Sequence, residues 1–342
     1  MVNAGSAAML LAIALAGCRT RAGAATSAPD ACVDAVPSIE LASMPPPAEP
    51  SADGDSLVDA EAVAPTRREA KTLTYRLTTG TKPPRDLPNA WVYVPAGFEP
   101  RQRALHVVVI FHGYSNCISS YVSEKGERCG PGTPKRTGYD IPAQGVKSGT
   151  RALLVVPQLA FDARSSDPGP LGEPNGLRAF LGELLERLAP EIGVHTLADV
   201  DRLGLLAASG GYMALFPALK QGGVDVRDVF MLDTLYYFDH PALDFVHDHI
   251  ADFAAGASGG RRLSLIWCNG AGTEEASQYF ADRVQTEMMR AGLESSMHVR
   301  SEPPRPTSVE DLRAPISILH SSLYHDDVTR EDLWKMLAAS GI

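Results

Sequence analysis

Residues 200–212, VDRLGLLAASGGY, run from a short apolar segment straight into a serine that stands between small residues. Three leucines and two alanines between positions 203 and 208 form the apolar segment, which is typical of a central parallel strand covered on both faces. A helix signal follows the serine directly. We therefore predict a buried strand, a sharp turn at Ser209 and a helix, in that order.

The turn at Ser209 has the small-x-Ser-x-small spacing of a nucleophile elbow, because Ala207 and Gly211 lack bulk two places before and after the serine. Such a turn lifts the serine Oγ above the edge of the sheet, so we predict that Ser209 is a nucleophile. The amide of Gly210, at the start of the helix, would stabilise a developing oxyanion. Ala207 stands where this motif usually has its first glycine. The spacing by itself also fits an ordinary tight turn.

Strand and helix signals alternate along the rest of the chain. The runs at 73–77 and 90–94 predict an antiparallel opening pair, and the apolar run LHVVVIF at 105–111 predicts a buried parallel strand. Further strands are predicted at 153–157, 229–233, 262–268 and 297–300, and helices at 176–192, 211–221, 242–254, 274–290 and 328–339. This alternation predicts an α/β fold with a mostly parallel sheet and helices on both faces.

Together these features resemble the α/β-hydrolase superfamily over the whole predicted folded region. The resemblance is carried by His112-Gly113 after the third predicted strand, by Ala207–Gly211 at the turn, and by a C-terminal histidine. It implies a mid-chain serine, an acid after a later strand and a histidine before the last helix. It also implies that the amide of Tyr114, or that of Gly113, joins the Gly210 amide in an oxyanion hole. We expect His112 itself to be structural and to hold the loop by a hydrogen bond.

Asp233 is the first candidate for the acid, because it stands at the carboxyl end of a predicted strand, where side chains project into the site. The superfamily more often uses the next strand, but that strand ends in Trp267-Cys268-Asn269-Gly270, without a carboxylate. Glu274 and Glu275 in the following helix are therefore alternatives, and Asp239 is a remoter one. A turn-capping role is the structural alternative for Asp233.

The predicted base is His325, with His320 as the alternative. This fold places the histidine in the loop before the last helix, and the helix signal begins at about Val328, which leaves His325 in the loop. His320 ends the apolar run at 316–319, so its plainer interpretation is a partly buried, hydrogen-bonded residue. If that run is itself the last strand, however, His320 comes out at the edge of the site.

The N-terminal segment has the pattern of an exported protein. Residues 7–16 are an unbroken apolar run, and Leu15-Ala16-Gly17-Cys18 resembles the lipobox of bacterial lipoproteins. We therefore predict a signal peptide at 1–17, lipid on Cys18, a disordered tether at 18–70 that is rich in Ala, Pro, Ser and acidic residues, and a hydrolase domain at 71–342. The expected location is the bacterial cell envelope, on the periplasmic or outer-membrane face, with the lipid anchor as the only membrane contact; secretion is the alternative.

Once Cys18 is set aside, four cysteines remain in a chain that we expect to be exported and therefore oxidised. Cys117 and Cys129 enclose a polar, glycine-containing stretch, and we predict that they form a disulfide. Cys32 lies in the predicted tether and Cys268 ends an apolar strand, so we expect these two to stay free or buried.

Other patterns argue against several classes of function. A net charge of −10 without any basic run argues against nucleic acid as a partner. His247 and His249 would point about 200° apart on a helix and so could not share a metal ion. No phosphate-binding loop or dinucleotide fingerprint is present in the sequence. We expect neither a metal nor an organic cofactor.

We therefore expect a serine hydrolase that cleaves an ester, thioester or amide through an acyl-enzyme, with an esterase favoured over a peptidase or amidase. The substrate would be a small-molecule, lipid or peptide ester, and the stretches 117–129 and 162–175 would frame its pocket. The alternative is a non-catalytic binding or surface lipoprotein, because folds of this type also serve without chemistry.

Overall fold

The computed structural model describes residues 69–342, except for 83–86, 100–103, 131, 161–165, 194, 239–240 and 256–259. The predicted signal peptide, Cys18, Cys32 and nearly all of the predicted tether lie outside these residues. The described strands are β1 (Lys71–Tyr75), β2 (Ala90–Val94), β3 (Leu105–Phe111), β4 (Leu153–Pro157), β5 (Val200–Ala208), β6 (Asp228–Leu232), β7 (Arg262–Trp267), β8 (Met297–Arg300) and β9 (Ile316–His320).

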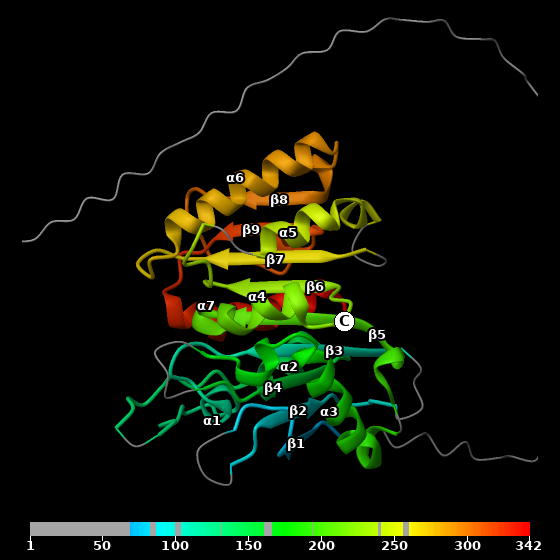
Figure 1. Ribbon diagram of the computed structural model, residues 1–342. Helices are drawn as coiled ribbons and strands as arrows, with labels where there is room; N and C mark the ends of the chain where they lie inside the picture. Colours follow the sequence, from blue (N-terminus) through cyan, green and yellow to red (C-terminus); the bar gives the residue numbers. More distant parts are fainter. Residues whose placement is uncertain are drawn as a thin grey trace, which may run out of the picture. The chain divides into compact units, whose positions relative to one another are not determined.

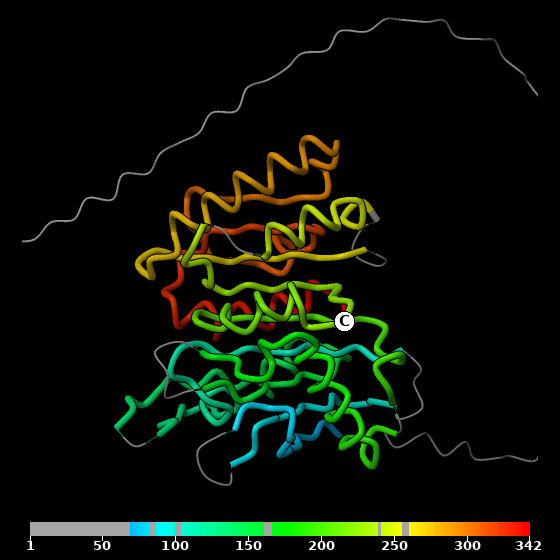
Figure 2. Tube along the Cα trace, viewed as in Figure 1, coloured from blue at the N-terminus to red at the C-terminus, as the bar shows by residue number. Residues whose placement is uncertain are grey.

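These strands form one sheet in the order β1-β2-β4-β3-β5-β6-β7-β9-β8 (Figure 1). β2 pairs antiparallel with both β1 and β4, and all other neighbours are parallel. The blue opening strands therefore lie at one edge of the sheet and the orange β8 lies at the other (Figure 2). The predicted α/β class and its antiparallel opening pair are confirmed.

The described α-helices are α1 (Ile118–Val122), α2 (Ile141–Ser148), α3 (Gly176–Ile192), α4 (Tyr212–Gln221), α5 (Pro241–Asp248), α6 (Glu274–Arg290) and α7 (His325–Ser340). Among the helices that the structure describes, none has both the length and the apolar character needed to cross a membrane.

Alternate residues of the central strands enter two apolar cores. Val107 and Val109 of β3 belong to a core shared with α3, α4, α5 and α6, whereas Val108 and Ile110 belong to a second core shared with α1, α2 and α7. Side chains of a strand alternate between the two faces of a sheet, so a strand that is apolar throughout requires cover on both sides. This explains why the uninterrupted apolar runs at β3 and β5 form the middle of the sheet.

The parallel strands β3, β5, β6, β7 and β9 all end on the same side of the sheet, which we call its carboxyl edge, as distinct from the outer strands β1 and β8. Their registers pair Phe111 with Ala207, Ala208 with Leu232, and Trp267 with His320, each at or next to the end of its strand. The residues that follow these strands are therefore brought to a common edge, although they are widely separated in the sequence.

Two helices were not predicted from the sequence. Pro142 and Gly145 make the α2 segment look unsuitable for a helix, yet proline is tolerated in the first turn, where Pro142 stands. A Cβ on Gly145 would lie 2.9 Å from the ring of Tyr93, so this glycine allows α2 to pack closely on the sheet. Asp140, whose side chain accepts from the Ala143 amide, also caps the helix locally. The short α1 was also missed.

Several element boundaries differ from the prediction. Helix α7 begins at His325 rather than near Val328, because Asp326 and Asp327 occupy its first turn, where negative charge favours a helix N-terminus. The prediction that His325 lies in a loop is therefore wrong. Both 297–300 and 316–320 are strands, and the predicted helix at 242–254 divides into α5 and a 3-10 helix (Ile250–Ala255).

Candidate active site

Ser209 stands at the sharp turn between β5 and α4, within one turn of 3-10 helix (Ser209–Gly211). Its φ of 51° lies in the left-handed region, which is uncommon for a residue other than glycine and is typical of strain at a functional site. A Cβ at Gly211 would lie only 2.4 Å from the carbonyl oxygen of Phe111, so the turn also requires glycine there. The strand order and this turn together decide the fold. The chain has the α/β-hydrolase fold.

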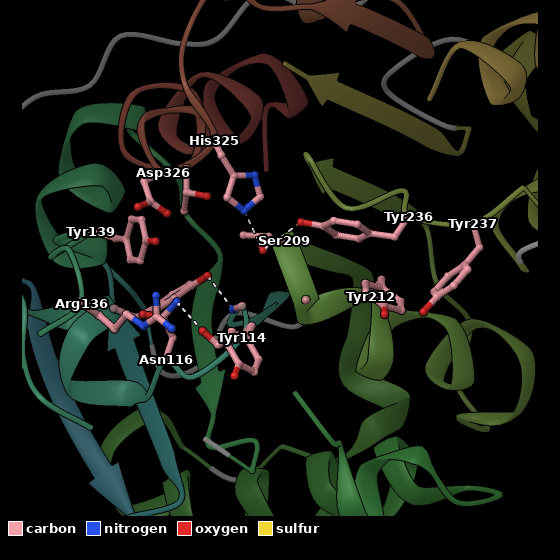
Figure 3. Close-up of a pocket in the computed structure, with 15 residues that line it drawn as sticks. Tyr114, Asn116, Arg136, Tyr139, Ser209, Tyr212, Tyr236, Tyr237, His325 and Asp326 are labelled. Atoms are coloured by element: carbon pink, nitrogen blue, oxygen red, sulfur yellow. Dashed lines mark hydrogen bonds between the residues drawn. The ribbon is translucent and has the colours of Figure 1, made fainter. Parts of the chain in front are cut away.

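His325 links Ser209 to Asp233 by two short hydrogen bonds. The imidazole Nε2 lies 2.7 Å from Ser209 Oγ (Figure 3). The other ring nitrogen, Nδ1, lies 2.5 Å from Asp233 Oδ2. An ionised carboxylate can only accept, so we assign the ring proton to Nδ1 and leave Nε2 free to accept from the serine hydroxyl. The serine, the histidine and the aspartate come from the ends of β5, α7 and β6.

Asp233 is completely buried, and both of its carboxylate oxygens are hydrogen-bonded. The Cys268 thiol donates to Oδ2 at 2.9 Å, the Cys268 amide donates to Oδ1 at 3.3 Å, and the Thr273 hydroxyl also donates to Oδ1. A buried charge is tolerated only when such donors surround it. These bonds hold the carboxylate plane in the direction of His325.

The negative charges near His325 favour the protonated form of its imidazole. Burial by itself would lower the pKa of His325, but the hydrogen bond and charge of Asp233, with a further contribution from the charge of Asp326, raise the pKa above its ordinary value. Burial and the Asp233 charge raise the pKa of Cys268 strongly, so its thiol stays protonated and serves as a donor.

The loop after β3 lies directly against the turn at Ser209. A Cβ on Gly210 would come within 2.9 Å of the Tyr114 backbone nitrogen, and one on Gly113 would come within 3.0 Å of Ser209 Cβ. The absence of side chains at these two glycines lets the two backbones meet. The Tyr114 backbone nitrogen thereby lies close to Gly210, beside the serine.

His112 is buried and fixes the position of this loop through hydrogen bonds. Its Nε2 accepts from the Leu159 amide at 2.9 Å, which leaves the proton on Nδ1 to be donated to the Gly113 carbonyl at 3.1 Å. Burial lowers the pKa of His112 to about 4, so the ring is neutral at ordinary pH. The Tyr121 hydroxyl also accepts from the Gly113 amide at 3.1 Å. These contacts are those of a residue that positions the loop.

The alternative site residues have other partners. His320 is buried, stacks on Trp267 at a centroid distance of 3.7 Å, and places its Nδ1 2.7 Å from the Ser301 carbonyl and its Nε2 3.0 Å from Asn269 Oδ1. Both of its ring nitrogens are therefore engaged away from the serine.

Glu274 and Glu275 do not approach the Asp233–His325 pair either. Glu274 accepts from the Gly270 amide, and Glu275 is exposed on α6. Asp239 lies outside the described residues.

One set of possible metal ligands occurs among the described residues, formed by Asp233, Cys268 and His325. Their ligand atoms already satisfy one another, because the thiol and the imidazole Nδ1 both donate to the carboxylate. A metal here would have to displace both protons, and the strongly raised pKa of the thiol opposes that. The chemistry of these donors fits a hydrogen-bonded chain better than a metal centre.

A cavity of about 420 Å³ opens at Ser209 and His325. On one side three tyrosines, Tyr212, Tyr236 and Tyr237, pack with ring centroids 5.6 and 5.8 Å from Tyr212, and the Tyr236 hydroxyl lies 3.4 Å from Ser209 Oγ. On the other side lie Asn116, Arg136 and Tyr139 (Figure 3). The cavity thus has one wall of three tyrosines and an opposite, mixed wall that carries Arg136 and Asp326.

Of the two stretches predicted to line this cavity, 117–129 contributes a lining residue and the described part of 162–175 does not. Cys117 and Cys129 form the predicted disulfide, and Tyr121 between them lines the cavity. None of the described residues of the stretch 162–175 lines it; Ser166 comes close to Gly210 but faces away from open space. That part of the prediction is not supported.

Several residues of the site were missed in the sequence. Tyr236 belongs to a run of three aromatic residues shortly after Asp233, and such a run beyond a strand end is a signal that could have been used. Thr273 precedes α6 and looks like an ordinary helix cap. Arg136 lies in a charged loop, and nothing in its local sequence distinguishes it from a solvated cation.

Comparison with known proteins finds likeness in structure only. No protein-family model and no curated protein matches the chain. A ferulic acid esterase aligns at 14% identity over 80% of this chain and 98% of its own, with a TM-score of 0.45. The fluorophosphonate-binding serine hydrolase F of Staphylococcus aureus aligns at 10% identity, over 80% of this chain and 98% of its own, with a TM-score of 0.44. The esterase Pf2001 of Pyrococcus furiosus aligns at 12% identity over 80% of this chain and 91% of its own, with a TM-score of 0.39. Likenesses this distant say nothing about the activity of this chain.

Proposed function

We propose that the protein is a serine hydrolase that cleaves an ester, thioester or amide through an acyl-enzyme on Ser209. The observation that carries the proposal is the continuous hydrogen-bonded chain from Ser209 Oγ through His325 to the buried Asp233. Its support is chemical: a serine hydroxyl is a weak nucleophile until a neighbouring base takes its proton. The strained backbone at Ser209 presents the oxygen to the cavity.

In the proposed reaction, Ser209 Oγ attacks the carbonyl carbon while His325 Nε2 takes the hydroxyl proton. The Tyr114 and Gly210 amides stabilise the oxyanion, and Asp233 stabilises the imidazolium and keeps the proton of Nδ1 in place. His325 then gives its proton to the leaving oxygen, sulfur or nitrogen, and an acyl-serine remains. Water, deprotonated by the same histidine, releases the acid and restores the serine.

Ser209→Ala tests this proposal most directly. Turnover of an activated short-chain ester should fall by about 10⁴- to 10⁶-fold in kcat, and labelling by a fluorophosphonate probe should be lost. Ser322→Ala is a matched control, because Ser322 is an exposed serine in the loop before α7. A folded Ser209→Ala protein with wild-type rates would overturn the proposal. A wild-type protein that neither reacts with the probe nor turns over esters would favour the non-catalytic binding protein.

The choice of base is tested by a pair of histidine variants. The kcat/KM of wild-type enzyme should rise with pH through the pKa of His325, and His325→Ala should remove both the activity and this dependence. His320→Ala should retain the pH dependence in whatever fraction folds. Loss of the activity in folded His320→Ala together with its retention in His325→Ala would reassign the base.

We further propose that the chain is exported to the bacterial cell envelope and anchored there through lipid on Cys18. The proposal rests on the sequence before Arg19 and agrees with the Cys117–Cys129 disulfide, since disulfides persist in oxidising compartments. In a bacterial host, intact-mass measurement should find a mature chain that begins at a lipidated Cys18, and Cys18→Ser should block the modification. An unlipidated chain that still carries residues 1–17 would contradict it.

A further inference from the structure

Arg136 is a cation on the wall of the cavity whose role the proposed reaction does not explain. It lies across the cavity from Tyr236 and Tyr237, beside Tyr114 and Asn116 (Figure 3). Within the described residues, no carboxylate lies within ion-pair distance of its guanidinium. Its Nε is buried and has no hydrogen-bond partner there. A guanidinium on the cavity wall without a carboxylate partner among the described residues is available to bind an anion.

The backbone around Arg136 is held in place. Its amide donates to the Glu127 carbonyl at 2.8 Å, and an isolated β-bridge joins the neighbouring Arg128 and Lys135. The disulfide between Cys117 and Cys129 closes the segment that contains Glu127 and Arg128, the two partners of this stretch. A side chain that starts from a fixed backbone loses less freedom when it binds a ligand.

The guanidinium is also oriented. Its central carbon lies 5.7 Å from the ring centroid of Tyr114, within the range of a cation–π contact. Tyr114 provides one of the two amides at the proposed oxyanion site, so Arg136 and the reacting carbonyl share one side of the cavity. An arginine oriented in this way presents a planar fork of N–H donors, which matches the two oxygens of a carboxylate.

Asp326 is the acidic side chain on the same cavity wall. It stands in the first turn of α7, where the helix N-terminus stabilises negative charge, and its charge contributes to the raised pKa of His325. Beyond it, Arg330 pairs with Asp327 at 3.0 Å and not with Asp326. Asp326 is thus associated with His325 and does not neutralise Arg136 by direct contact.

We propose that Arg136 is a specificity-determining residue that binds a carboxylate carried by the ester substrate. The proposal rests on the serine hydrolase function proposed above and narrows its substrate class to esters with an anionic group a few atoms from the scissile bond. The carboxylate would accept hydrogen bonds from the cavity-facing N–H groups of the guanidinium while Ser209 attacks the ester carbonyl.

Two pairs of esters test this proposal. Monophenyl adipate and phenyl adipamate differ in a carboxylate or carboxamide on the acyl side, and para-acetoxybenzoate and para-acetoxybenzamide differ in the same way on the leaving side. Neither carboxylate is placed to attack its own ester readily. The measured quantity is the ratio of kcat/KM for the anionic and the neutral member, compared between variants so that intrinsic reactivity cancels.

Arg136→Gln should lower this ratio by about 10- to 100-fold in at least one pair, which is the effect of losing hydrogen bonds to a charged group. Arg136→Lys should retain part of the preference. Lys135→Gln is the matched control, because it removes the same charge from an exposed neighbour that does not line the cavity, and it should leave both ratios unchanged.

An equal loss for the anionic and neutral esters would make Arg136 a positioning residue for Tyr114 and would overturn the proposal. Hydrolysis of the neutral esters by wild-type enzyme without any Arg136-dependent charge preference would also overturn it, and would leave the proposed function intact. Absence of all Ser209-dependent turnover would overturn both. If Arg136→Gln does not fold, the Arg136→Lys ratio and competitive inhibition of wild-type enzyme by adipate against adipamide decide the question.

Discussion

Strand β6 is flanked by two completely buried aspartates whose partners differ in kind. Asp228, at its amino end, accepts from Arg202 Nε at 2.6 Å and from Arg202 Nη2 at 2.7 Å. Asp233, just past its carboxyl end, accepts from His325, Cys268 and Thr273. The two carboxylates share residue type, burial and strand, so their different roles must come from their surroundings.

The proton affinity of the partner is the main difference. Burial alone would lower the pKa of Arg202, but the hydrogen bonds and charge of Asp228 raise it, so this arginine never releases a proton at ordinary pH. His325 can release one, because its pKa is raised from a much lower ordinary value. The amino-end pair is therefore a fixed charge pair, whereas the carboxyl-end pair can exchange a proton with Ser209.

Asp233→Asn should produce the largest effect on activity. The asparagine amide would donate toward His325 Nδ1, which favours the wrong imidazole tautomer, and kcat should fall by about 10⁴-fold. Asparagine tolerates the positive φ of 51° at this position, so the fold should be retained. Ester hydrolysis and thermal unfolding of the purified variant measure the two quantities. A variant with near-native kcat would show that Asp233 is not the acid.

Asp228→Asn should have the opposite result, with little change in kcat of the folded enzyme and a large loss of stability. It would leave Arg202 without its carboxylate beside the buried Arg262, and removal of one partner of a buried ion pair costs about 3–5 kcal/mol. Urea unfolding gives the free energy. The double variant Arg202→Met with Asp228→Leu should recover much of the lost free energy of unfolding. An Asp228→Asn protein as stable as wild type would show that the two ends of β6 do not differ in this way.

Cys268→Ala should have an intermediate effect. It removes the thiol that donates to Asp233 Oδ2 at 2.9 Å, so the carboxylate is held less firmly and kcat should fall about tenfold. Cys268→Ser restores a donor at the same place and should recover most of the rate. If alanine and serine are equally active, the thiol contributes only packing.

Asp326→Asn should have the smallest effect, a shift in pH dependence. Loss of its negative charge makes the imidazolium less stable, so the pKa of His325 falls. Because the neutral imidazole is the reactive form, the acid limb of the kcat/KM profile should move to lower pH, by less than about one unit for a single charge near solvent. Asp327→Asn is the control, since Asp327 pairs with Arg330 at 3.0 Å. An unchanged profile would exclude this electrostatic contribution.

Many of the helices and strands can be predicted from local sequence patterns. The predicted ranges of the helices at 176–192 and 274–290 are those in the structure, because apolar residues recur at helical spacing along both. The strand at 297–300 also has its predicted range, although its pattern is weaker. Helix α2 was missed although Asp140 caps its first turn and Gly149 ends it in the left-handed conformation. Only the structure shows that Gly145, which weakens the helix locally, allows close packing against Tyr93.

The sequence by itself determined that a serine follows a buried strand at 200–208. It also offered Asp233 as the first of four acidic candidates, and two histidines, at later positions from which they could reach the serine. Only the tertiary structure decided between the histidines. His320 turns to Ser301 and Asn269 and stacks on Trp267, whereas the first turn of α7 brings His325 to 2.7 Å from Ser209 Oγ. Arg136 and Thr273 likewise acquire their positions from contacts with distant segments. Local sequence specifies strands, turns and helices through short-range periodicity and backbone preference, but the direction of a side chain in a shared cavity depends on where separate elements pack, and that is a property of the whole fold.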